Sequence, residues 1–147
     1  MQLSGPWDRA QVADFLDRTA VPLRLAVNGS QGFPVMASLW FLRDGDDLLC
    51  ATSPRARLVE LLQVDPRCGF EVSADQPPYC GVRGRARAAL SQTGGGALLE
   101  RLLDRYAIAR DGGLARWLLA RADEEVVITL SPLRVLSWDY RRRMGDG

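Results

Sequence analysis

The sequence predicts a single α+β domain in which an antiparallel barrel, or a strongly curled sheet, of about six to seven strands is flanked by helices. Three observations lead to this prediction. Short apolar segments of strand length follow one another across tight turns, and segments with helical periodicity are inserted between them. Residues 1–147 also contain no repeat or change in composition that would divide the chain. The predicted order, α-βββ-α-ββ-αα-ββ, disfavours a doubly wound parallel sheet.

The first third of the chain is predicted to form a helix and a meander of three strands. Residues 7–19 place their apolar side chains on one helical face. Residues 21–27 alternate as a strand, and the Asn-Gly turn of residues 28–32 follows. Residues 33–42 are almost continuously apolar, which predicts a strand buried on both faces. After a second glycine-containing turn, residues 47–51 are expected to form a short third strand.

The middle of the chain changes period from strand to helix and back. Thr52 and Ser53, followed by Pro54, predict a helix start, because hydroxyl caps and a first-turn proline are typical of helix N-termini. This helix is expected to run to about Val64, with its leucines Leu58, Leu61 and Leu62 facing inward. Strands are then predicted over residues 68–73 and 79–90.

The strand predicted at residues 79–90 has a sharp two-residue alternation. Arg83, Arg85 and Arg87 share one face, and small apolar residues occupy the other. The arginine face is interpreted either as a solvated face that discourages aggregation or as a contact for a partner subunit or an anionic ligand. Helices are predicted at residues 98–106 and through residues 117–118, followed by final strands at residues 125–130 and 133–140.

The composition excludes several classes of chemistry. The net charge is +1, so no global positive field favours nucleic acid. The chain contains no histidine, which excludes histidine bases, histidine triads and histidine metal ligands. All 19 basic residues are arginines, so Schiff-base chemistry through lysine is also excluded. Any anion site must therefore use arginine forks, backbone N–H groups and hydroxyls.

The three cysteines and the N-terminal segment predict a cytoplasmic protein. Cys50, Cys68 and Cys80 form no CxxC pair, and with no histidine available we expect no metal site. We interpret them as reduced, buried small hydrophobic residues in a reducing compartment. The first residues lack a signal-peptide pattern, and no apolar run is long enough to span a bilayer, so no membrane contact is expected.

An ordered set of segments resembles the pyridoxamine phosphate oxidase-like superfamily, which includes flavin and deazaflavin reductases of similar length. The resemblance extends over roughly residues 10 to 140. The segments that carry it are Gly32–Pro34, Ser38–Leu42, Asp44–Asp46, Leu48–Arg57, Leu61–Leu62, Asp65–Arg67, Pro77–Tyr79, Val82–Gly84 and Val135–Asp139.

The resemblance implies a single FMN-binding domain with a split β-barrel fold, assembled as a homodimer with FMN in each interface cleft. Arg55, Arg57 and the hydroxyls before them would hold the FMN phosphate at a helix start. The strand Ala37–Trp40 would form the wall beside the ring system. The implied cofactor-binding residues are Ala37, Ser38, Leu39, Trp40, Ala51, Thr52, Ser53, Arg55, Arg57 and Tyr79. No catalytic side chain is identified.

The function that the resemblance implies is an FMN-dependent oxidoreductase acting on a small-molecule substrate. The cofactor carries the hydride chemistry in this class, which suits a chain without histidine. Authentic vitamin oxidase activity is not expected, because the substrate residues of that enzyme include a histidine. Leu58 also stands where family members place a lysine. The alternatives are a deazaflavin-dependent reductase, whose longer anionic tail would lie along Arg83, Arg85 and Arg87, and a non-enzymatic dimer that binds a small ligand.

Overall fold

A computed structural model of the chain describes residues 1–141 of the 147. Runs of consecutive strands are separated by single helices or a helix pair, and one short 3₁₀ helix precedes the last strand. In chain order the elements are β1 (Gln2–Ser4), α1 (Arg9–Arg18), β2 (Leu23–Asn28), β3 (Pro34–Leu39), β4 (Phe41–Asp44), β5 (Asp47–Thr52), α2 (Arg57–Val64), β6 (Arg67–Ser73), β7 (Cys80–Ser91), α3 (Gly95–Arg105), α4 (Gly113–Leu119), η1 (Ala122–Glu124) and β8 (Val126–Asp139).

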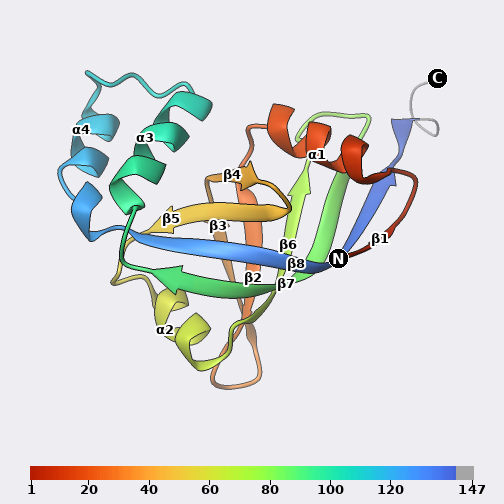
Figure 1. The fold of residues 1–147 in the computed structure, drawn as a ribbon, viewed down its shortest axis with the longest axis horizontal. Coiled ribbons are helices and arrows are strands. Elements are labelled where there is room, and N and C mark those ends of the chain that lie inside the picture. The colour runs from red at the N-terminus through yellow and green to blue at the C-terminus, as the bar shows by residue number, and fades with distance from the viewer. Residues whose placement is uncertain (142–147) are drawn as a thin grey trace.

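The strands form one curled sheet in the order β3-β2-β6-β7-β8-β5-β4. All pairs along this path are antiparallel, and β1 lies parallel to β8 outside it. Figure 1 shows α3 and α4 side by side at one end of the sheet, α1 over the other end and α2 below β7. The prediction of an α+β fold with an antiparallel split barrel is confirmed. The three-residue strand β1 was not predicted.

The last two predicted strands are in fact one, β8, so the prediction of a break at Ser131-Pro132 is wrong. The pairing with β7 changes register there: Arg85 lies opposite Arg134, whereas Ala86 lies opposite Pro132. Leu133 is therefore an extra residue, and the irregularity is a β-bulge. A proline has no backbone N–H to donate and is tolerated at such a bulge, which bends the strand without ending it.

The strand predicted over residues 33–42 divides at Trp40 into β3 and β4, and the prediction that both its faces are buried is wrong. Among the described residues, β3 is an edge strand that pairs with β2 alone. Ala37 and Leu39 pack against the core, whereas Met36, on the opposite face, is 63% exposed. A run of apolar residues cannot distinguish a central strand from an edge strand with one open face.

The helix predicted to start at Thr52 begins five residues later. Thr52 remains in β5, where it pairs with Val126 of β8. Ala56 occupies the N-cap of α2, and no side chain caps this helix. The predicted inward face is confirmed, because Leu58, Leu61 and Leu62 are buried.

The main core lies inside the curled sheet and is closed on one side by α1 and on another by α2. Phe15, Leu25, Phe41 and Ile128 are among its fully buried members. Cys50, Cys68 and Cys80 are buried and unpaired, as predicted. Burial raises the pKa of the Cys50 thiol to about 12 and that of Cys68 to about 11, so both are protonated at neutral pH.

Candidate functional site

The turn between β5 and α2 contains Arg55, and Arg57 follows it; these are the two arginines predicted from the sequence to bind a phosphate. The Ser53 hydroxyl accepts a hydrogen bond from the backbone N–H of Arg55 at 3.2 Å, and the Ser53 carbonyl accepts one from Ala56 at 3.0 Å. These bonds fold the chain back before α2 begins. Arg55 therefore lies in the turn, and Arg57 is the first residue of the helix. Both side chains are exposed.

The arginines of this turn have acidic residues nearby, since Glu124 and Glu125 line a hollow beside Arg55, but no salt bridge within residues 1–141. Neither Arg55 nor Arg57 forms an ion pair with a described residue. The first turn of α2 contains Glu60 but no side-chain cap. The Val59 N–H donates to the Ala56 carbonyl at 3.0 Å, so of the leading groups only the N–H groups of Arg57 and Leu58 remain available among the described residues. Two cations at a helix N-terminus oppose the helix dipole, which makes the arrangement favourable only when an anion lies beside it. An anion placed beside the turn would offset this opposition.

A second element, not identified from the sequence, borders the same turn. Trp117 and Arg121, from α4 and the residue after the helix cap, line a hollow of about 50 Å³ together with Ser53 and Arg55. Arg121 lies over the Trp117 ring, 5.3 Å from its centroid, and Trp117 is 58% exposed. The hollow also includes Glu125, whose pKa is raised by burial and by the charge of Glu124. Nothing in the local pattern of α4 indicates this contact, because it depends on how two distant segments meet.

The residues predicted to flank a ring system lie on different sides of β3. Ala37 and Leu39 point into the core, and Ser38 points outward, where it accepts a hydrogen bond from Arg24. Trp40 is half-buried and packs against α3. Their side chains therefore do not form one common wall. The strand offers instead an edge of backbone N–H and C=O groups that faces away from β2 and pairs with no strand of residues 1–141.

Tyr79 and Thr52 lie at opposite ends of β8 within one protomer. Thr52 pairs with Val126 at the start of that strand, as does Ala51 with Val127. Tyr79 accepts a hydrogen bond from the backbone N–H of Tyr140, just beyond the end of β8. One copy of the chain therefore does not bring Tyr79 to the β5–α2 turn.

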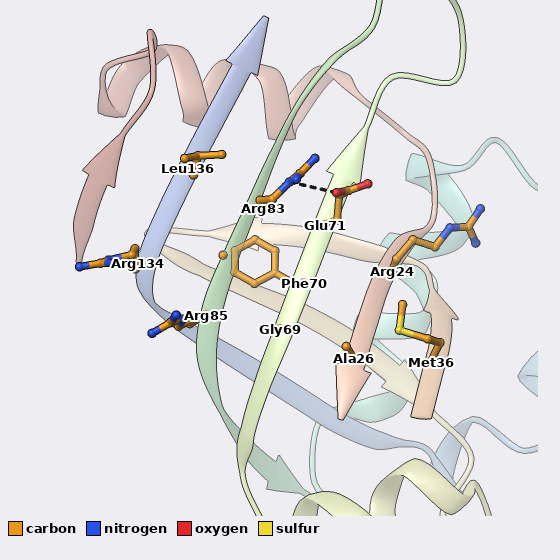
Figure 2. Close-up of a pocket in the computed structure, with 11 residues that line it drawn as sticks. Arg24, Ala26, Met36, Gly69, Phe70, Glu71, Arg83, Arg85, Arg134 and Leu136 are labelled. Atoms are coloured by element: carbon orange, nitrogen blue, oxygen red, sulfur yellow. Dashed lines mark ion pairs between the residues drawn. The ribbon is translucent and has the colours of Figure 1, made fainter. Parts of the chain in front are cut away.

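A larger hollow, of about 520 Å³, lies on the outer face of the sheet (Figure 2). Cross-strand pairing aligns its lining in two rows, because directly opposed residues point to the same face. The first row runs Met36, Ala26, Gly69, Arg85, Arg134, and the second runs Ser38, Arg24, Glu71, Arg83, Leu136. Ser38 flanks the hollow, and the other nine residues line it. Figure 2 shows Arg85 and Arg134 on one side, Arg24 and Met36 on the other, and Ala26 and Gly69 between them.

The predicted alternation of Arg83, Arg85 and Arg87 is confirmed, since all three are exposed on the outer face. Arg83 and Arg85 line the hollow, whereas Arg87 lies one row further along, opposite Arg67. Arg83 forms an ion pair with Glu71 at 3.2 Å and lies over the Trp138 ring, 4.2 Å from its centroid.

Comparison with known proteins rests on structure alone. No protein-family model and no curated protein sequence matches the chain. Among solved structures, the conserved protein Rv2991 of Mycobacterium tuberculosis superposes with a TM-score of 0.76 at 20% identity, covering 95% of this chain and 89% of that one. An F420 reductase gives a TM-score of 0.65 at 21% identity, covering 83% and 94% of the two chains.

A candidate pyridoxamine 5′-phosphate oxidase from Listeria innocua also gives a TM-score of 0.65, at 16% identity, covering 86% of this chain and 94% of that one. The chain has the split-barrel fold of the pyridoxamine phosphate oxidase-like proteins. The neighbours within this split-barrel group include flavin-related and deazaflavin-related proteins, such as the F420 reductase and a flavocytochrome of Azotobacter vinelandii. Identities of 15–21% to these proteins establish the fold and leave the activity to be argued from the site.

Within residues 1–141, no three acidic or cysteine side chains gather in a way that could hold a metal ion. No helix in the same part of the chain is long and apolar enough to cross a bilayer.

Proposed function

We propose that this chain is a flavin-dependent oxidoreductase that binds FMN and acts on a small-molecule substrate. The observation that carries the proposal is the β5–α2 turn, where Arg55 and Arg57 have no acidic partner among the described residues and α2 has no side-chain cap. A phosphate monoester fits this turn because it would neutralise both guanidinium groups and accept hydrogen bonds from the free N–H groups at the start of α2.

The remaining residues of the region fit the rest of such a cofactor. The unpaired edge of β3, from Ala37 to Leu39, can donate and accept hydrogen bonds along the rim of a flat heterocycle. Leu58 is buried against the core, so the position that carries a lysine in the resembling family is here a packing position. The arginines Arg55 and Arg57 must then supply the positive charge. A bound flavin supplies hydride transfer, and the chain binds, orients and shields it.

We propose in addition that two copies of the chain assemble into a homodimer. Tyr79 and the β5–α2 turn, both implied in cofactor binding, lie at opposite ends of β8 in one protomer. A second copy would bring its own Tyr79 to the turn of the first. Sedimentation of the purified protein at micromolar concentration tests this, and a monomer at all concentrations would refute it.

The visible absorption spectrum of the purified protein, before and after incubation with FMN and desalting, tests the cofactor assignment. Retained flavin bands support the proposal. A second candidate is a deazaflavin cofactor, favoured by the similarity to the F420 reductase, and a parallel titration with F420 distinguishes the two. A protein that retains neither FMN nor F420 is a split barrel without redox activity of this kind, and the proposal is then wrong.

A further inference from the structure

The segment that leads from α4 through η1 to β8 is held against α3 and passes beside the β5–α2 turn (Figure 1). Ala115 of α4 and Ala122 of η1 both pack against the apolar side chains of α3. Between these two elements, the Arg121 N–H donates to the Leu118 carbonyl at 3.2 Å, and the Arg121 carbonyl accepts from the Glu124 N–H at 3.0 Å. The backbone that carries the Arg121 side chain is therefore fixed by packing and by hydrogen bonds.

Trp117 is the largest side chain of α4, yet 58% of it is exposed. It lines the small hollow beside Ser53 and Arg55, and Arg121 lines the same hollow. The Arg121 guanidinium lies over the indole, 5.3 Å from the ring centroid. A guanidinium on the face of an indole is favourable and restricts a side chain that is otherwise free to take many conformations. Trp117 therefore holds the Arg121 side chain next to the β5–α2 turn.

The hollow brings cations and carboxylates together without an ion pair between described residues. Glu124 and Glu125 line it, but neither forms a salt bridge with Arg55 or Arg121. Two guanidinium groups thus share a space of about 50 Å³, and Arg57 follows at the start of α2. Like charges this close repel one another unless an anion lies between them. A phosphate monoester brings up to about two negative charges at neutral pH.

We propose that Arg121 is a third cation for the terminal phosphate of the flavin, and that Glu124 and Glu125 restrict this end of the site to a cofactor that ends in a phosphate. The inference rests on the proposed function, because it uses the same turn, and it adds the residues that select among flavins. Trp117 is a positioning residue for Arg121. The hollow of about 50 Å³ admits few atoms beyond a phosphate. The longer anionic tail of a deazaflavin would meet the two carboxylates there.

Titration of the full chain with FMN and with riboflavin, which lacks the phosphate, tests the role of Arg121. Arg121→Gln should bind FMN about ten-fold more weakly than wild type and riboflavin with unchanged affinity. Arg121→Lys, which keeps the charge, should recover part of the loss. Trp117→Ala should also weaken FMN binding without affecting riboflavin, because Arg121 loses its support. Arg116→Gln is the matched control, at an exposed arginine of α4 that does not line the hollow, and should change neither affinity.

A parallel titration with F420 tests the selection against a longer tail. Wild type should bind FMN at least about ten-fold more tightly than F420, and Glu124→Gln should raise the affinity for F420 more than that for FMN. A wild type that binds F420 as tightly as FMN would overturn the selection.

The outcomes for Arg121 separate this inference from the proposed function. If wild type binds FMN and Arg121→Gln binds both flavins as wild type does, the third cation is wrong and the site at Arg55 and Arg57 stands. Equal losses of FMN and riboflavin affinity in Arg121→Gln would show a structural role and would also overturn the inference. A wild type that binds no flavin contradicts the proposed function and this inference with it.

Discussion

Trp40 stacks on Tyr106, with ring centroids 5.1 Å apart and ring planes inclined by 16°. The contact joins the short break between β3 and β4 to the end of α3. The Tyr106 hydroxyl donates to the Val21 carbonyl at 2.8 Å and accepts from the Phe41 backbone N–H at 3.2 Å. Burial raises the pKa of Tyr106, so the hydroxyl stays protonated and keeps its donor role well above neutral pH. One side chain thereby connects the segment just before β2, the start of β4 and the end of α3.

Tyr106→Phe should lower the free energy of unfolding by about 1–3 kcal/mol, because it retains the stack on Trp40 but leaves the Val21 carbonyl and the Phe41 N–H without their partner. Urea unfolding followed by circular dichroism measures the change. Tyr140→Phe, at a tyrosine that is 43% exposed, serves as the control and should be close to neutral. Equal stability of wild type and Tyr106→Phe would show that water replaces both hydrogen bonds.

Gly69 of β6 pairs with Arg85 of β7, and Gly84 of β7 pairs with Phe70 of β6. The two glycines differ in the space around them. A Cβ at Gly84 would lie 2.3 Å from the Arg134 carbonyl oxygen and 2.8 Å from the Phe70 ring. Gly84→Ala should therefore destabilise the fold by at least about 2 kcal/mol through overpacking. Gly69→Ala, where the added methyl meets only ordinary contacts, should be neutral or stabilising by up to about 1 kcal/mol. Thermal or urea unfolding of the two variants compares them directly, and similar losses in both would contradict this explanation.

Asp139 should make the fold sensitive to acid. Hydrogen bonds from Arg141, followed by a weaker one from the Trp7 indole N–H at 3.3 Å, lower the pKa of Asp139 from 3.8 to about 2. A carboxyl whose pKa is lower in the folded state stabilises the fold above its unfolded pKa. The contribution of Asp139 is therefore present above about pH 4 and is lost as the pH falls towards about 2.

Asp139→Asn tests this dependence. The variant should be less stable than wild type at pH 6, and the difference should shrink steadily between pH 4 and pH 2, as measured by urea midpoints across the range. Asp111→Asn, at an exposed aspartate without an ion pair to any described residue, should show no such convergence. A difference between wild type and Asp139→Asn that stays constant with pH would mean that the effect is one of packing.

Arg57→Ala should weaken FMN binding about ten-fold, because it removes one charge-assisted contact from the proposed phosphate site. Folding should be unaffected, since the side chain is exposed and has no partner within residues 1–141. Fluorescence titration with FMN gives the affinity, with Arg101→Ala as the control for loss of a surface arginine. Identical FMN affinities for wild type and Arg57→Ala would remove this residue from the site.

The fold was predicted correctly where the periodicity of apolar and polar side chains shows directly which face of a strand or helix is buried. The alternation of Arg83 and Arg85 on β7 and the inward leucines of α2 were both predicted correctly, because each pattern is set by which face is buried. Prediction failed where the decisive contact is distant in sequence. Thr52 resembles a helix cap, but its pairing with Val126 keeps it in a strand. Met36 resembles a core residue, but the edge position of β3 leaves it exposed.

The candidate sites also differ in whether neighbouring residues in the sequence or distant ones form them. Arg55 and Arg57 are close in the chain, so a local motif could identify them, whereas the neighbouring Trp117 belongs to a helix about sixty residues away. The outer hollow draws on five strands, and its existence depends on a register that places Gly69 between Ala26 and Arg85. No single-strand pattern contains that information.

The position of β8 has a consequence for how the protein is made. This strand follows every other described strand in the chain, yet it lies between β5 and β7 and also pairs with β1. During synthesis, β5 and β7 must therefore wait with open hydrogen-bonding edges until residues 126–139 have left the ribosome. Such edges are templates for pairing between chains. We expect nascent chains shorter than about 126 residues to be aggregation-prone and to depend on chaperones, since the sheet can close only after its last strand emerges.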